Sequence, residues 1–125
     1  MVMENRGKKI LVVDDDPDIL DALQFTLEDA GYDVTTTEKG EYAENLHDSN
    51  GGLPDIIILD VLLSGKDGRI ICQNLKSRED TKHIPILMIS AHPAAKQSVK
   101  AVGADDFLAK PFDIDELLAK VASYL

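Results

Sequence analysis

The stretch ILVVDDDPDIL, residues 10–20, sets four apolar residues directly before three consecutive aspartates and a proline. A short run of apolar, mostly β-branched residues favours a buried strand. Asp16 then suits a helix N-cap, Pro17 suits the first helical position, and Leu20 begins an apolar helical repeat. The stretch therefore predicts a strand that passes directly into an amphipathic helix.

The same alternation continues along the chain. Apolar runs predict strands at about 9–14, 33–37, 55–60, 85–90 and 105–109, with helical patterns between them. Within the third and fourth of these runs, residues 56–59 and 86–89 are apolar at every position, which is typical of strands covered by helices on both faces. We therefore expect an α/β fold, a doubly wound parallel sheet of five strands flanked by five helices.

The predicted helices differ in how clearly the sequence marks their ends. Gly31 ends the first helix, and Asp113 with Glu116 forms a capping-box pattern at the start of the last one. The second and fourth helices, at about 41–47 and 93–102, are weakly amphipathic. Phe112 against Leu117 is expected to form a hydrophobic staple at the start of the last helix, ahead of the apolar residues Ile114, Leu118, Val121 and Leu125.

Composition argues against several classes of protein. The chain has 125 residues, of which 44% are hydrophobic and 29% charged, and this fits one globular domain. A formal net charge of −10 argues against a nucleic-acid-binding surface, which needs clustered Lys and Arg. Cys72 is the single cysteine, and no apolar run reaches the ~18 residues of a membrane span. We expect a cytoplasmic domain at residues 8–125 after a loose polar leader at 1–7.

Polar residues interrupt the apolar pattern where the predicted strands end. Asp14 and Asp15 follow the first strand, Asp60 the third, Ser90 the fourth and Lys110 the fifth. Ligands of open α/β sheets bind at the carboxyl ends of the strands, and a doubly wound sheet makes the first and third strands neighbours. We therefore expect the three carboxylates to share one crevice.

Such a crevice needs a cation. Two carboxylates ~4 Å apart repel by about 4 kcal/mol at an effective dielectric of about 20. Mg²⁺ removes this repulsion and is typically held by one or two carboxylates together with water and phosphate oxygens. Lys110 adds a positive charge that can meet the same phosphate. A carboxylate nucleophile, a metal site, a hydroxyl and an ammonium together indicate phosphoryl transfer.

Four segments of the sequence carry a resemblance to a known family. ILVVDDDPDIL, PDIIILDVLLSGKDG, PILMISA and GADDFLAKPF are similar, in order and spacing, to the signature blocks of the response-regulator receiver domain of two-component signalling. The resemblance covers about residues 8–125. It implies a flavodoxin-like strand order of 2-1-3-4-5, which members of this same family exemplify. It also implies a phosphoacceptor switch that receives a phosphoryl group from a sensor histidine kinase or a phosphotransfer protein.

The resemblance also implies roles for individual residues. Asp60 would be the phosphoacceptor, Asp15 and Asp60 would bind Mg²⁺ directly, and Asp14 would act through a water molecule. The backbone carbonyl of Leu62 would complete the protein ligands. The domain would then assist its own phosphorylation and dephosphorylation at Asp60 without being a conventional turnover enzyme.

Further residues are implied to contact the phosphoryl group or to respond to it. Ser90 would donate a hydrogen bond to one phosphoryl oxygen, and Lys110 would pair with another. Phe107 would be the switch aromatic whose rotamer follows Ser90, and His92 would lie at the edge of the pocket. Pro111 follows a peptide bond that is usually cis in the family. Ser90 stands where the family more often has Thr, and Phe107 where it often has Tyr.

Three other functions compete with this interpretation. A haloacid-dehalogenase-like phosphatase needs a second Asp two residues after the nucleophile, where this chain has Leu62. A flavodoxin-like mononucleotide binder needs a Ser/Thr/Gly-rich phosphate loop after the first strand, where this chain has acids. A degenerate receiver, which is never phosphorylated and acts as a protein-interaction module, is the remaining alternative. The switch would act on a downstream protein or on an output domain outside this chain, with no binding of nucleic acid or membrane by this domain.

Overall fold

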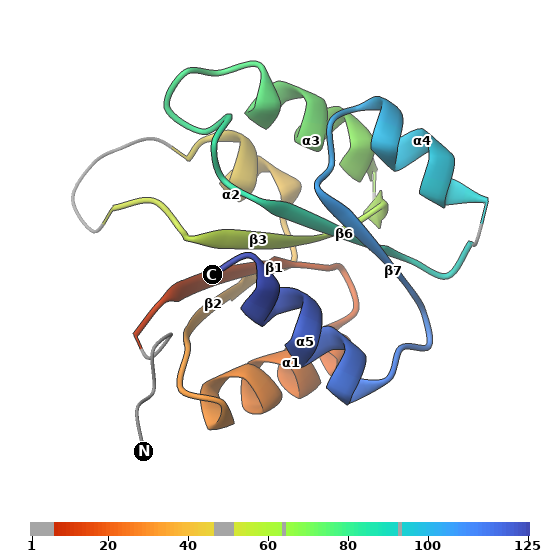
Figure 1. The fold of residues 1–125 in the computed structure, drawn as a ribbon. Coiled ribbons are helices and arrows are strands. Elements are labelled where there is room, and N and C mark those ends of the chain that lie inside the picture. The colour runs from red at the N-terminus through yellow and green to blue at the C-terminus, as the bar shows by residue number, and fades with distance from the viewer. Residues whose placement is uncertain (1–6, 47–51, 64, 93) are drawn as a thin grey trace.

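Five parallel strands form the central sheet of this computed structural model, which describes residues 7–46, 52–63, 65–92 and 94–125 (Figure 1). The strands are β1 (Lys9–Val13), β2 (Asp33–Thr37), β3 (Ile56–Asp60), β6 (Ile86–Ser90) and β7 (Asp106–Ala109). Their order is β2-β1-β3-β6-β7, and all neighbouring pairs are parallel. The expected order 2-1-3-4-5 is confirmed, because β6 and β7 are the fourth and fifth strands of this sheet along the chain.

Helices cover both faces of the sheet. α1 (Pro17–Asp29) and α5 (Ile114–Ser123) lie on one face, and α2 (Gly40–Glu44), α3 (Gly68–Lys76) and α4 (Ala95–Ala101) lie on the other (Figure 1). This doubly wound arrangement confirms the predicted α/β fold class. Within the described ranges, none of the helices is long and apolar enough to cross a membrane.

Two of the three inner strands, β3 and β6, have no exposed face. Every residue of both strands is buried. Successive side chains point to opposite faces, so Ile57 and Leu59 join the apolar cluster under α3, whereas Ile56 and Ile58 join the cluster under α1. The sheet therefore separates two apolar cores, and polar side chains of these strands are found only at their carboxyl ends.

The first helix forms as its sequence predicts. The carboxylate of Asp16 accepts a hydrogen bond from the Asp18 N–H at 3.0 Å, and Pro17 occupies the first turn. α1 buries the leucines of its apolar face. It ends before Gly31, whose φ of 100° disfavours residues with a side chain.

The start of α5 differs from the prediction in one detail. The carboxylate of Asp113 accepts a hydrogen bond from the Asp115 N–H at 2.9 Å, so the cap reaches the second residue of the helix instead of Glu116, the third. Ile114, one of the apolar residues that the sequence assigns to this helix, is 44% exposed. The reason is that Ile114 opens the helix, while the buried Leu117 takes the core-facing position of this turn.

Two helices are shorter than the sequence predicts. α2 ends at Glu44 and α4 begins at Ala95. His47 and Pro93, at the ends of the predicted helices, lie outside the described residues. Residues 1–6 of the predicted leader also lie outside them.

The structure contains a short hairpin that no sequence pattern predicts. Its strands, β4 (Leu62–Leu63) and β5 (Lys66–Asp67), are antiparallel. After the hairpin, the Gly68 N–H donates to the Val61 carbonyl at 2.7 Å. A Cβ atom at Gly68 would lie 2.1 Å from the Asp60 carbonyl oxygen, so only glycine fits this close approach. The chain between β3 and α3 is thus folded back onto the end of β3.

Candidate functional site

Three carboxylates meet at the carboxyl end of the sheet. Asp14 and Asp15 directly follow β1, Asp60 ends β3, and β1 and β3 are neighbours. One carboxylate oxygen from each residue lies within 4.8 Å of the others. Asp14 is fully buried, Asp60 is 6% exposed, and Asp15 is half-buried. The structure therefore brings together the three acids expected to share a crevice, and their oxygens suit a hard divalent cation.

Asp14 keeps its hydrogen bonds although it is fully buried. Its Oδ1 accepts from the Asp16 N–H at 2.9 Å, and its Oδ2 accepts from Lys110 Nζ at 2.9 Å. A buried carboxylate is costly unless it is paired and hydrogen-bonded. Asp14 therefore depends on Lys110, while Asp16 serves both as the N-cap of α1 and as a backbone donor to Asp14.

Lys110 connects the two buried acids. Its Nζ lies 2.9 Å from Asp14 Oδ2 and 3.4 Å from Asp60 Oδ2, and its side chain is 17% exposed. Burial lowers the pKa of Lys110, but the hydrogen bond to Asp14 and the charges of both acids outweigh this effect and raise it overall. Lys110 is therefore cationic around neutral pH. Its backbone N–H donates to the Ser90 carbonyl at 2.8 Å, and this hydrogen bond fixes Lys110 beside β6.

The charge of Asp60 is opposed by its burial and by its neighbour Asp14. Burial, followed by the charge of Asp14, raises the pKa of Asp60 to about 6, although Lys110 and the Leu62 N–H at 3.5 Å act in the opposite direction. A bound divalent cation would add positive charge and lower this pKa again. The site therefore favours cation binding whenever Asp60 is ionised.

Ser90 lies at the end of β6, next to β3. It is 1% exposed, and its Oγ accepts a hydrogen bond from the His92 N–H at 3.0 Å. A cavity of about 360 Å³ opens beside Ser90 and is also lined by His92, Arg69 and Ala95. His92 is exposed and lines this cavity, and its role at the edge of the phosphoacceptor pocket stays a prediction.

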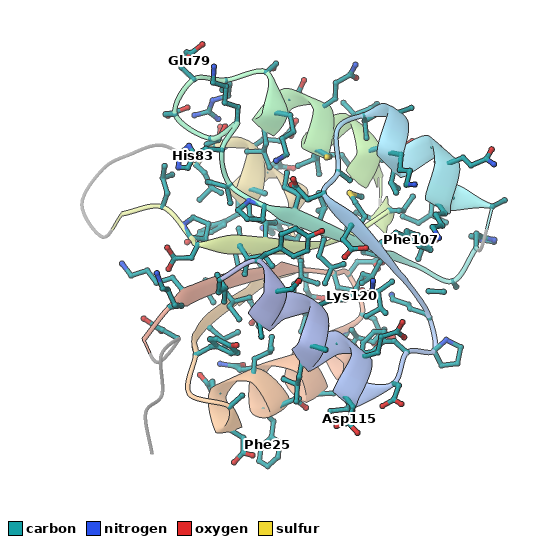
Figure 2. All side chains as sticks on the ribbon, viewed as in Figure 1. Phe25, Glu79, His83, Phe107, Asp115 and Lys120 are labelled. Carbon is teal, nitrogen blue, oxygen red and sulfur yellow. The ribbon has the colours of Figure 1, made fainter. Side chains whose placement is uncertain are left out.

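Phe107 and Leu62 are two further residues of the predicted site. Phe107, on β7, pairs in register with Met88 of β6 and packs against the apolar cluster under α3 (Figure 2). Leu62, two residues after Asp60, is 53% exposed. The peptide bond between Lys110 and Pro111 is cis, as the resemblance implies.

No sequence pattern singles out Arg69, although it lies close to the site. It is in the first turn of α3, lines the cavity beside Ser90, and donates from Nη1 to Ser98 Oγ of α4 at 3.2 Å. The only signal is its position directly after Asp67 and Gly68, the turn residues that start α3. A motif-based prediction passes over such a residue, because its importance depends on contacts between helices.

A second cavity, of about 250 Å³, lies away from the acids. Its lining includes Lys9 and Asp33, the first residues of β1 and β2, and Tyr42 of α2. It is therefore at the amino ends of these strands. The acidic cluster is at their carboxyl ends, so this cavity is not part of the site.

The acids, the hydroxyl and the lysine lie at the edge of the sheet where proteins of this architecture bind their ligands. Acids that suit a divalent cation, with a lysine between two of them, are the features of a phosphoacceptor signalling domain. The chain belongs to the response regulator receiver domain family, whose model matches residues 10–122.

Known proteins are similar to the chain in sequence and in fold. The DNA-binding dual master transcriptional regulator RpaA of Synechocystis sp. is 41% identical over 119 residues, which are 94% of this chain and 48% of RpaA. A putative response regulator from Chloroflexus aurantiacus is 37% identical with a TM-score of 0.86, covering 95% of this chain and 98% of that one. TrrA of Thermotoga maritima, solved in complex with Mg²⁺ and BeF, is 32% identical with a TM-score of 0.83, covering 94% and 99%. The chain spans about half the length of the curated relatives it matches.

Proposed function

We propose that the chain is a phosphoacceptor switch of two-component signal transduction and that a sensor histidine kinase or a phosphotransfer protein phosphorylates Asp60. The placement of Lys110, with its Nζ 2.9 Å from Asp14 and 3.4 Å from Asp60, is the observation that carries this proposal. This placement sets the Lys110 ammonium beside the Asp60 carboxylate, which is nucleophilic when ionised. Phosphoryl transfer needs mainly alignment and neutralisation of charge, and this arrangement provides both.

The residues at the site fit Mg²⁺. The donors are all oxygens, which hard divalent cations prefer. Asp15 and Asp60 would hold the ion directly, Leu62 through its backbone carbonyl, and Asp14 through a water molecule. When bound, Mg²⁺ would supply positive charge that aligns and neutralises the phosphoryl oxygens. TrrA, a protein of similar fold, has been solved in complex with Mg²⁺ and BeF, and this supports the proposal of a Mg²⁺ site in this chain.

The transfer step moves the phosphoryl group from the donor's imidazole to Asp60. A carboxylate oxygen of Asp60 attacks the phosphorus, an O–P bond forms, and the bond from phosphorus to the donor's imidazole nitrogen breaks. The imidazole of the donor takes the bonding electron pair and, with a proton on its other ring nitrogen, leaves as neutral imidazole. Lys110 then pairs with one phosphoryl oxygen, and the Ser90 hydroxyl donates a hydrogen bond to another, so that both stabilise charge on the transferred group.

The signal would pass from Asp60 to α4 through Ser90 and Phe107. A phosphoryl oxygen at Asp60 would attract the Ser90 hydroxyl, whose oxygen accepts from the His92 N–H in this structure. Phe107 packs on the same apolar cluster as Ala95 and Val99 of α4. A shift of Phe107 would therefore change the surface that α4 offers to a partner.

We propose that this partner is a downstream protein or an output domain. RpaA is named a DNA-binding transcriptional regulator and matches this chain over 48% of its own length, which supports an output domain joined to a receiver in that relative. The alternative is a receiver that is never phosphorylated. The complete set of Asp14, Asp15, Asp60, Ser90 and Lys110 argues against it, because an interaction module has no need to bury two acids beside a lysine.

Incubation with Mg²⁺ and phosphoramidate, followed by intact-mass measurement, tests the proposal. We expect the mass of one phosphoryl group to be added to the wild type and none to Asp60→Asn. Removal of Mg²⁺ with a chelator is expected to abolish the addition. An unchanged mass of the wild type, or equal labelling of Asp60→Asn, would reject Asp60 as the phosphoacceptor.

A further inference from the structure

The backbone of Leu62 is held from one side by β5. In the hairpin, Leu62 pairs with Asp67, and Leu63 pairs with Lys66. Side-chain burial does not fix Leu62, because 53% of its surface is exposed. Strands of two residues are too short to be stable by themselves. Apart from its buried neighbours Val61 and Leu63, the position of Leu62 therefore depends on what anchors Lys66 and Asp67.

Lys66 is anchored to α2. Its ammonium forms an ion pair with the carboxylate of Glu44, and the two side chains are 34% and 21% exposed. Glu44 also accepts a hydrogen bond from Asn74 Nδ2 of α3 at 3.1 Å. The hydrogen bond with Lys66 lowers the pKa of Glu44, and the same bond raises the pKa of Lys66. Both groups are therefore charged around neutral pH, and one carboxylate ties Lys66 to two helices.

Asp67 is anchored to α3 and α4. Its carboxylate accepts from Arg69 Nε at 2.9 Å, from Arg69 Nη2 at 2.6 Å and from the Arg69 backbone N–H at 2.9 Å. Arg69 Nη1 in turn donates to Ser98 Oγ of α4 at 3.2 Å. A bidentate guanidinium–carboxylate pair fixes geometry as well as charge. Because α2 and α4 lie on the two sides of α3 (Figure 1), the hairpin is anchored in two directions.

We infer that the two ion pairs of β5 are positioning devices that hold the Leu62 carbonyl in place for the divalent cation of the acidic cluster. This inference rests on the proposed function, which places the cation there. Metal ligands are oriented by the contacts behind them, and loss of such a contact weakens metal affinity. Lys66 and Glu44 are not members of the acidic cluster, so their replacement leaves its three carboxylates unchanged.

Lys66→Met tests the anchor to α2. The substitution removes the ammonium and keeps a long apolar stem. The Mg²⁺ dissociation constant, measured by isothermal titration calorimetry without a phosphoryl donor, is expected to rise about threefold to tenfold. Glu44→Gln breaks the same ion pair from the other side and is expected to have the same effect. Lys66→Arg keeps a cation at this position and is expected to retain most of the wild-type affinity.

Lys120→Met is the matched control. Lys120 of α5 forms an ion pair with Asp106 at 3.1 Å, with side chains 26% and 28% exposed, which is close to the exposure of the Lys66–Glu44 pair. It lies on the opposite face of the sheet from the hairpin (Figures 1 and 2). We expect its Mg²⁺ dissociation constant to equal that of the wild type. Thermal unfolding without Mg²⁺, measured for each variant, reports any general loss of stability.

The outcomes separate this inference from the function on which it rests. Weaker Mg²⁺ binding by Lys66→Met and Glu44→Gln, with wild-type binding by Lys120→Met, supports the positioning role. Unchanged Mg²⁺ binding by Lys66→Met and Glu44→Gln, with or without a loss of thermal stability, overturns the positioning role and leaves the proposed function intact. Absence of Mg²⁺ binding by the wild type overturns both.

Discussion

Asp60 is the residue at which burial opposes charge. Its pKa is raised to about 6 by burial and by Asp14, from a reference value of 3.8. Between these two pH values the folded state binds more protons at Asp60 than the unfolded state does, so this group's contribution to stability falls as pH rises through about 6. Without Mg²⁺, Asp60→Asn is therefore expected to unfold with a higher free energy than the wild type above pH 7, by roughly 1–3 kcal/mol.

Urea unfolding of both proteins across this pH range measures the effect of Asp60→Asn. The stabilisation is expected to shrink toward pH 4, close to the reference pKa of the carboxyl group. Asp21→Asn, which removes a carboxylate from the exposed surface of α1, is the control and is expected to change the free energy of unfolding little. A gain in stability at Asp60→Asn that is constant over the whole range would contradict a raised pKa at Asp60.

Lys110 is the positive charge on which the two buried acids depend in the absence of a metal ion. Lys110→Met leaves Asp14 buried and uncompensated, and we expect the free energy of unfolding to fall by about 1–3 kcal/mol. Mg²⁺ should recover more stability in this variant than in the wild type, because it neutralises the same carboxylates. Urea unfolding with and without Mg²⁺ measures both effects. An equal Mg²⁺ effect in the two proteins would show that the ion does not bind beside these acids.

Lys82→Met provides the comparison for Lys110→Met. Lys82 pairs with Glu79 at 3.1 Å on the surface, where the two side chains are 52% and 90% exposed. Exposed pairs of this kind contribute little to stability, because water and salt screen them. We expect Lys82→Met to unfold nearly as the wild type does and to respond to Mg²⁺ as the wild type does.

At the level of elements, the hairpin β4–β5 is the part of the site region that was hardest to predict from the sequence. Strands of two residues are too short for an alternating pattern, and their anchors Glu44 and Arg69 lie in other elements. The strand ends were predictable for a different reason. Parallel strands end at one edge, so polar residues after apolar runs must gather there, and the structure places Asp14 and Asp60 together in this way.

Gly68 is the residue that joins this hairpin to α3. Alanine at this position would place a Cβ 2.1 Å from the Asp60 carbonyl oxygen, and that backbone cannot move without displacing the end of β3. We expect Gly68→Ala to lower the free energy of unfolding by about 2–4 kcal/mol. Gly65→Ala is the control: its Cβ meets nothing within 4 Å, and only its φ of 71° is unfavourable, at a cost of about 1 kcal/mol. Urea unfolding that ranks Gly65→Ala as the more damaging change would contradict the close approach at Gly68.

At the scale of the whole molecule, the order of the elements along the chain was enough to predict the architecture. Strands buried on both faces must be covered on both sides, and five strands alternating with helices favour a doubly wound sheet. The extents of α2 and α4 were not predictable to the same degree, because weakly amphipathic segments depend on their neighbours for stability. α4 is the helix that the proposed switch would have to move. It has only seven residues, so its stability depends mainly on packing against its neighbours.

The switch predicts that a signal at Asp60 reaches α4 only if residue 90 carries a hydroxyl. Saturation with Mg²⁺ and BeF, the combination in the solved TrrA complex, is expected to change amide hydrogen exchange in α4 (Ala95–Ala101) of the wild type. In Ser90→Ala this change in exchange should fall to less than about half of the wild-type change, because residue 90 then has no hydroxyl to donate to the bound group. Ser90→Thr keeps the hydroxyl and should retain the response. Ser77→Ala, which removes an exposed hydroxyl on the Asn74 carbonyl, is the control and should respond as the wild type does. If Ser90→Ala binds Mg²⁺ and BeF and shows the full change in α4, the signal travels by another route, and Phe107 packs against its apolar cluster without acting as the switch.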